Sequence, residues 1–216
     1  MENNVFNNVL FDLDGTLTNP YMGITNSLMY ALERMGYEVP PREELSSFIG
    51  PPLINEYQRR FGMSEEQARE GVRLYREYFA DKGIFENELI DGAPELLAEL
   101  KARGKRVFLA TSKPREFAER ILAHFGIAEY FDFVGASTMD GRINEKHEVI
   151  ADLLKKTGAD TSECLMVGDR FHDIEGAHRF GIKCCAVLCG FGSREEFIEH
   201  NADFISETLL GVADLV

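Results

Sequence analysis

The sequence predicts an α/β protein built on a doubly wound, Rossmann-like parallel sheet. Short apolar runs rich in β-prone residues alternate with stretches of helical pattern. Several helical stretches end at a glycine, as helix C-termini often do, and Gly104 and Gly126 are two examples. This alternation favours parallel strands whose two faces are both covered by helices. A long helical segment interrupts it after the first strand.

Five stretches are candidate strands. They are "NVLF" ending at Phe11, "RVFLAT" ending at Thr111, "YFDFVGA" near Val134, "CLMVGD" ending near Gly168 and "CCAVL" near Val187. Helical patterns separate the later strands, at Pro94 to Arg103, Arg115 to Phe125, Glu145 to Lys156 and His172 to Phe180. We expect the strand order 3-2-1-4-5, in which strand 1 is central and the order reverses between strands 1 and 4.

The segment that follows the first strand predicts an inserted helical domain. Asn19-Pro20 suits a helix start, and apolar residues then recur on one face as far as Met35, before Gly36. Ser64 and Gln67 form a capping-box pattern ahead of a further helix. We expect a four-helix cap domain over 19–83, with 1–18 and 84–216 forming the Rossmann-like core domain.

The amino-acid composition limits the classes of function that the protein can have. The chain has 216 residues, of which 44% are hydrophobic and 28% charged, so it can bury a sizeable core and is not membrane-embedded. Its net charge of −14 repels a phosphate backbone, which argues against a nucleic-acid polymer as partner. No basic region followed by an apolar one opens the chain, so no signal peptide is expected. A cytoplasmic protein follows, monomeric by default, with a dimer as the alternative.

All four cysteines lie late in the sequence, and three fall within "IKCCAVLCG". Adjacent Cys184 and Cys185 would point to opposite faces of a strand. We expect buried, reduced thiols rather than a zinc site.

Polar residues gather where three of the predicted strands end. Ligands of open α/β sheets bind outside the carboxyl ends of the strands, at the point where the strand order reverses. The neighbouring strands 1, 2 and 4 would deliver their polar residues to this edge. These residues are Asp12, Asp14, Thr111, Ser112, Lys113, Asp169 and Asp173.

The carboxylates predict a metal site. Asp12, Asp14 and Asp169 would repel one another strongly if they lay close together without a cation. Oxygen ligands suit a hard ion, so Mg²⁺ is expected rather than zinc. Such an ion offsets the repulsion between an anionic nucleophile and an anionic phosphate substrate.

The set "FDLDGTLT", "ATSKP", Lys146 and "GDRFHD" resembles the four motifs of the haloacid dehalogenase-like hydrolase superfamily, and the likeness covers essentially the whole chain. The inserted helices resemble the cap of the branch that contains phosphoglycolate phosphatases and β-phosphoglucomutases. The resemblance implies a Mg²⁺-dependent phosphatase that acts on a small phosphorylated metabolite through an aspartyl-phosphate. The substrate would be phosphoglycolate-like or a nucleoside 5′-monophosphate, and the cap would close over the site and select it.

The same resemblance implies roles for the motif residues. Asp12 matches the nucleophile, and Asp14 matches the general acid that later acts as the base. Lys146 would supply positive charge to the phosphate and to the nucleophile. Thr111 would donate a hydrogen bond to a phosphate oxygen, supported by the backbone at Ser112.

The remaining matches concern the metal and the phosphate surroundings. Asp12, the backbone carbonyl of Asp14 and Asp169 would hold Mg²⁺, with Asp173 as a further ligand or an orienting residue. Gly15 would let the backbone approach the phosphate closely. Lys113 and Arg170 are expected in the neighbourhood of the phosphate.

Three points stay open at this level. Arg142 competes with Lys146 as the cation, and Lys146 is favoured because it opens a helix. The turn Gly50-Pro51-Pro52 is either a substrate loop or a structural turn. Tyr21, Arg42, Tyr57 and Arg59 in the cap either meet the substrate or lie on the surface.

Three other functions compete with the phosphatase. A phosphomutase of the β-phosphoglucomutase type would carry a basic residue in the loop where this chain has Gly50 to Leu53. A dehalogenase would lack a carboxylate at the position of Asp14. A non-catalytic phosphate-binding or phospho-accepting signalling domain is the alternative from another class, but receiver domains of that kind are shorter and have no cap.

Overall fold

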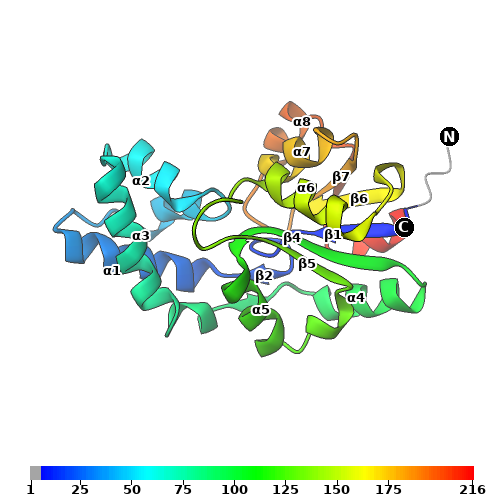
Figure 1. Cartoon of the computed structure of the whole chain (residues 1–216), viewed down its shortest axis with the longest axis horizontal. Coiled ribbons are helices and arrows are strands. Elements are labelled where there is room, and N and C mark those ends of the chain that lie inside the picture. Colours follow the sequence, from blue (N-terminus) through cyan, green and yellow to red (C-terminus); the bar gives the residue numbers. More distant parts are fainter. Residues whose placement is uncertain (1–5) are drawn as a thin grey trace. The chain divides into compact units, whose positions relative to one another are not determined.

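A computed structural model describes residues 6–216 and shows a six-stranded parallel sheet (Figure 1). Its strand order is β5-β4-β1-β6-β7-β8. The strands are β1 (Asn8–Phe11), β4 (Arg106–Pro114), β5 (Phe133–Ser137), β6 (Cys164–Gly168), β7 (Lys183–Val187) and β8 (Phe204–Ser206). A separate two-stranded sheet pairs β2 (Thr18–Asn19) with β3 (Glu88–Leu89).

The order predicted for the five apolar strands is confirmed, because β5, β4, β1, β6 and β7 follow one another in that arrangement. The edge strand β8 was not predicted. Its three residues are only half-buried, so they form no apolar run of the kind that marks a buried strand in the sequence. It pairs with β7 from Cys185↔Phe204 to Val187↔Ser206.

Helices cover both faces of this sheet. In Figure 1, α6, α7 and α8 lie on one face, and α4 and α5 lie on the other. Their bounds are α4 (Ala93–Ala102), α5 (Arg115–His124), α6 (Lys146–Thr157), α7 (Phe171–His178) and α8 (Arg194–Glu199). Short 3₁₀ helices lie in two connections, at η3 (Ala128–Tyr130) and η4 (Thr161–Glu163), and a third, η5 (Leu210–Leu215), follows β8.

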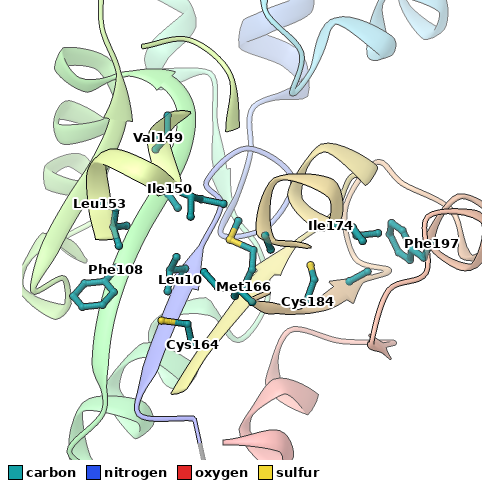
Figure 2. Close-up of a cluster of buried hydrophobic side chains, with 14 residues drawn as sticks. Leu10, Phe108, Val149, Ile150, Leu153, Cys164, Met166, Ile174, Cys184 and Phe197 are labelled. Carbon is teal, nitrogen blue, oxygen red and sulfur yellow. The ribbon is translucent and has the colours of Figure 1, made fainter. Parts of the chain in front are cut away.

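The hydrophobic core on the α6–α7 face of the sheet explains why the strands are continuous apolar runs in the sequence. Figure 2 shows Leu10, Phe108, Met166 and Cys184 projecting from four adjacent strands towards the helices. They meet apolar side chains of the three helices, namely Val149, Ile150, Leu153, Ile174 and Phe197. Alternate strand residues point to the opposite face. Each buried aliphatic or aromatic side chain stabilises the fold by roughly 1.5–3 kcal/mol.

The four cysteines are free, and three of them are buried. Cys184 belongs to the cluster beneath α6 and α7, whereas its neighbour Cys185 is buried outside that cluster. Packing therefore accounts for Cys184 and Cys185.

Contacts divide the chain into two compact units. One contains the described residues up to Asn19 together with Leu89–Val216, and the other is Pro20–Glu88. The regular elements of the second unit are helices, apart from Glu88, which belongs to β3. It contains α1 (Tyr21–Met35), η1 (Arg42–Phe48), α2 (Leu53–Phe61), α3 (Glu65–Phe79) and η2 (Gly83–Phe85).

Local chemistry fixes the helix ends of this second unit. The predicted capping box opens α3, where Gln67 N–H donates to Ser64 Oγ and Ser64 N–H donates to Gln67 Oε1. The apolar face predicted for α1 is buried, including Ile24, Leu28 and Leu32. No helix in the described part of the chain combines the length and the apolar character needed to cross a membrane.

Candidate active site

Three neighbouring strands end in the buried polar residues of the candidate site. β1 pairs with β4 on one side and with β6 on the other. Asp12 follows β1 directly, and its N–H donates to the carbonyl of Val167 in β6 at 2.9 Å. Asp169 follows β6, and Thr111 lies within β4. All three side chains are buried, so they form part of the protein interior and not a solvated rim.

The turn after β1 brings the chain against Asp169. Gly15 has a positive φ of 89°, a backbone conformation that residues other than glycine rarely adopt. A Cβ at this position would lie 2.2 Å from Asp169 Oδ2, so only glycine fits. The turn closes through hydrogen bonds from Gly15 N–H to the Thr18 carbonyl and from Leu17 N–H to the Leu13 carbonyl.

Lys146 is the first residue of α6, and its buried side chain reaches the end of β1. Its Nζ lies 2.6 Å from Asp12 Oδ1 and 2.8 Å from Asp173 Oδ1, and it donates to the Ala110 carbonyl at 2.7 Å. Burial alone would lower the pKa of this ammonium group, but attraction by Asp12 and Asp173 outweighs burial and raises it. Lys146 is therefore charged at neutral pH.

Packing between α6 and α7 leaves room for this lysine. A Cβ on Gly176 in α7 would lie 2.7 Å from Lys146 Cγ. The rival cation, Arg142, is placed elsewhere. Its Nε pairs with Asp140 at 2.6 Å, and its side chain is 82% exposed.

Asp12, Asp169 and Asp173 form a compact acidic cluster. One oxygen from each lies within 4.8 Å of the others, and all three residues are buried. Burial, followed by repulsion from Asp173 and Asp12, raises the pKa of Asp169 well above its usual range. Burial likewise raises the pKa of Asp173, because it outweighs the attraction of Lys146. One lysine is therefore not enough to keep all three carboxyl groups of the cluster ionised.

Asp169 is fixed from two sides by residues that the sequence analysis did not single out. Thr16 Oγ1 donates to its Oδ1 at 3.2 Å, and the N–H of Phe191 donates to its Oδ2 at 2.8 Å. A Cβ on Gly190 would lie 2.4 Å from the Asp169 Cβ. The glycines of "CGFG" are the sequence signal for this close approach.

Asp14 pairs with Lys113 rather than joining the acidic cluster. Lys113 Nζ lies 2.7 Å from Asp14 Oδ2, and both side chains are buried. Burial raises the pKa of Asp14, and Lys113 opposes this shift. The pairing of β4 with β5 shifts register between Thr111 and Pro114, and Ser112 and Lys113 lie on this irregular stretch.

Thr111 and Ser112 differ in exposure. Thr111 is buried, and its Oγ1 accepts a hydrogen bond from Lys113 N–H at 3.2 Å. Ser112 is half-buried. The phosphate contacts expected of these two residues stay predictions.

Arg170 lies beside the cluster and binds Glu196. Its Nε donates to Glu196 Oε1 at 3.1 Å, and its backbone N–H donates to Asp173 Oδ2 at 3.1 Å. The same Glu196 oxygen accepts from Phe171 N–H at 2.9 Å. Glu196 thus anchors the start of α7 to α8. It was missed because a glutamate within "SREEF" reads as an ordinary surface residue.

The candidate residues of the helical unit contact other residues of the same unit. Tyr57 is fully buried among aromatic residues that include Phe48 and Phe61. Arg42 donates to the side chains of Thr25 and Asn26 within the same unit. Arg59 pairs with Glu56, and Tyr21 is half-buried. In the turn before α2, Gly50 has a φ of 105°.

The acidic cluster fits a hard divalent cation. Its ligand atoms are carboxylate oxygens, which Mg²⁺ prefers over nitrogen or sulfur. When all three buried carboxyl groups are ionised, the one ammonium group leaves an excess negative charge, which a bound dication would neutralise. Asp14 was expected to contribute its backbone carbonyl, and its carboxylate is engaged by Lys113.

Comparison with known proteins agrees with this geometry. A family model described as haloacid dehalogenase-like hydrolase matches residues 9–187. A 5′-nucleotidase of Pseudomonas aeruginosa is 46% identical over 193 residues, which cover 89% of this chain and 87% of that protein. Tyrosine-protein kinase PtkA of Mycobacterium tuberculosis is 38% identical over 200 residues, which cover 93% of this chain but 65% of that longer protein.

A solved structure described as "a predicted phosphatase from Clostridium acetobutylicum" matches with a TM-score of 0.95 and 38% identity, covering 97% of both chains. The family resemblance stated from the motifs is confirmed by the family model, and the predicted enzyme class, a phosphatase of that family, is confirmed at this general level. The chain therefore belongs to the haloacid dehalogenase-like hydrolase family.

Proposed function

We propose that the protein is a Mg²⁺-dependent phosphatase that hydrolyses the phosphate monoester of a small metabolite through an aspartyl-phosphate on Asp12. The contact between the Lys146 ammonium group and Asp12, at the edge of a buried acidic cluster, is the observation that supports it best. An anionic nucleophile can approach an anionic phosphate only where positive charge is already in place.

Asp12 would attack phosphorus while Asp14 gives a proton to the leaving oxygen, so that the alcohol departs as the Asp12–phosphorus bond forms. Asp14, now ionised, would take a proton from water as the water oxygen attacks phosphorus and Asp12 is released. Lys146 stabilises negative charge on Asp12 and on the phosphate. The Thr111 hydroxyl and the backbone at Ser112 and Gly15 would bind phosphate oxygens, with Arg170 at the rim.

Asp12, Asp169 and Asp173 would hold the Mg²⁺ ion, together with the Asp14 carbonyl. When bound, the ion supplies charge neutralisation between the nucleophile and the phosphate. Thr16 and the N–H of Phe191 would keep Asp169 oriented for this task.

We propose a nucleoside 5′-monophosphate as the first substrate to test, since the 46% identical relative is named a 5′-nucleotidase. Phosphoglycolate is the second. Fold and family alone do not set specificity, which we assign to the inserted helical unit.

The test is phosphate release by the purified protein from a panel of nucleoside monophosphates, phosphoglycolate and sugar phosphates, with Mg²⁺ or with EDTA. We expect turnover that needs Mg²⁺ and that Asp12→Asn abolishes while the fold is kept. The matched control is Asp132→Asn, which removes a lysine-paired carboxylate distant in sequence from every motif. Near-normal Mg²⁺-dependent activity of Asp12→Asn would show that Asp12 is not the nucleophile.

Assays on the same purified protein distinguish the phosphatase from the alternative functions. Conversion of a sugar 1-phosphate to the 6-phosphate without phosphate release would identify a phosphomutase. A stable phosphorylated protein without turnover would identify a phospho-accepting domain. Transfer of phosphate from ATP to tyrosine would identify the activity that the name of PtkA describes.

A further inference from the structure

We propose that Lys113 is a positioning residue that selects Oδ1 of Asp14 as the oxygen that gives and takes the proton. The inference rests on the proposed function, and it differs from the phosphate-contacting role expected for Lys113 from the sequence. It assigns a task to one atom of the acid–base residue.

The geometry of the Lys113–Asp14 pair separates the two carboxylate oxygens. Oδ2 of Asp14 lies 2.7 Å from Lys113 Nζ, with the two side chains only 11% and 6% exposed. Oδ1 is buried and has no hydrogen-bond partner among the described residues. A buried polar atom without a partner is costly, and at functional sites it marks a position kept for a ligand.

The hydrogen-bonding capacity of lysine decides where the proton sits. An ammonium group has three donors and no acceptor. A proton on Oδ2 would therefore point at a group that cannot accept it, whereas a proton on Oδ1 faces no such conflict. While the pair is intact, the protonated form of Asp14 carries its hydrogen on Oδ1.

The backbone explains why Lys113 can reach this position. The register shift between Thr111 and Pro114 lies at the end of β4, next to β1, and Lys113 N–H is held by Thr111 Oγ1 at 3.2 Å. The turn after β1 is fixed on the other side by Gly15. Both partners of the ion pair therefore stand on fixed backbone, as a positioning role requires.

In the reaction, Oδ1–H donates its proton to the ester oxygen as the phosphorus–oxygen bond breaks and the Asp12–phosphorus bond forms. Oδ1 then accepts a proton from water as that water attacks phosphorus and the Asp12–phosphorus bond breaks. Lys113 gives up no proton in either step. It holds Oδ2 so that the side chain cannot rotate.

The experiment compares Lys113→Met with wild type on esters whose leaving groups differ in their need for a proton. An alkyl phosphate needs protonation of its leaving oxygen, and 4-nitrophenyl phosphate does not. General acid catalysis contributes about 10²–10⁴-fold to such steps. We expect kcat/KM to fall about 100-fold for the alkyl ester and less than about tenfold for the nitrophenyl ester, with the inhibition constant of inorganic phosphate unchanged.

Lys101→Met is the matched control, because it removes another lysine that pairs with an aspartate at 2.7 Å, outside the site. It should leave both esters and phosphate inhibition unaffected. Lys113→Arg keeps a donor for Oδ2 and should retain most of the alkyl-ester activity. This second variant tests the proposal even if Lys113→Met does not fold.

The decisive measurement is the double variant with Asp14→Asn. If Lys113 acts through Asp14, Lys113→Met adds no further loss in that background. Equal losses for both esters, weaker phosphate inhibition and additivity with Asp14→Asn would overturn the proposal in favour of direct phosphate binding. A wild-type protein that cleaves no ester of the panel, with or without Mg²⁺, would instead overturn the proposed function and the inference with it.

Discussion

Lys146 Nζ lies 2.6 Å from Asp12 Oδ1, although 134 positions separate the two residues in the chain. The same ammonium group also binds the Ala110 carbonyl in β4 and contacts Asp173 in α7. One buried cation therefore ties together two strand ends and two helices at the edge of the sheet. Its loss should be felt in stability as well as in turnover.

Lys146→Met should lower kcat/KM by about 10³-fold, because it removes a group that stabilises charge in the reaction. It should also destabilise the metal-free protein by about 3–5 kcal/mol, because it leaves buried Asp12 and Asp173 without their cation. Urea unfolding in EDTA and phosphate-release kinetics measure the two effects. The control is Lys156→Met, whose exposed pair with Asp152 lies in the same helix and contributes about 0.5 kcal/mol or less. A Lys146 variant as stable as this control would contradict the ion-pair argument.

Mg²⁺ should raise the unfolding temperature more at about pH 7.5 than at about pH 5. The pKa of Asp169 is raised by burial, then by Asp173 and Asp12, so the folded metal-free protein holds protons that the unfolded chain releases above about pH 4. Its stability therefore falls as pH rises through the folded pKa, until a bound cation replaces those protons. At 100 times its dissociation constant, the ion would contribute about 2.7 kcal/mol.

Calorimetry with and without EDTA at the two pH values measures this effect. Asp169→Asn removes one carboxylate and should abolish most of the Mg²⁺-dependent gain. An equal gain in that variant would mean that the ion binds elsewhere.

His172→Gln should flatten the pH dependence of stability between about pH 6.5 and about pH 4. Burial, followed by repulsion from Arg170 and Lys146, lowers the pKa of His172 to about 4. The unfolded chain binds a proton near pH 6.5 and the folded protein does not, so stability is lost as pH falls through this window. The slope should change by up to about 1.4 kcal/mol per pH unit.

Because the raised pKa values of Asp169 and Asp173 shift stability in the opposite direction, the readout is the difference in slope between wild type and variant. A His172→Gln variant that keeps the wild-type slope would contradict the assignment.

Gly15→Ala should abolish activity and destabilise the protein by about 2–4 kcal/mol, because the methyl group would sit 2.2 Å from Asp169 Oδ2 in addition to the cost of a positive φ. Gly158→Ala is the control that measures the cost of a positive φ without a steric clash. Gly158 has a φ of 63° at the end of α6, and a Cβ there meets no atom within 4 Å. It should lose about 1 kcal/mol and keep full activity. Equal effects of the two substitutions would rule out the steric argument.

Much of the core unit could be predicted from the sequence, because its signals are local. The apolar run at Asn8–Phe11 is buried on both faces, and the order of five strands is the doubly wound order expected for alternating strands and helices. Lys146 was favoured over Arg142 because it opens a helix, and it does open α6. Such patterns depend on residues a few positions apart, which the chain itself sets.

The contacts of individual side chains could not be predicted in this way. Lys113 was expected near the phosphate and binds Asp14, and Glu196 looked like a surface residue yet holds Arg170 and the start of α7. The sequence by itself determined which strands meet and which residues stand at their ends. Only the tertiary structure decided which charges pair, because that choice depends on a register shift, on close backbone approaches at Gly15 and Gly190, and on burial that strengthens each ion pair.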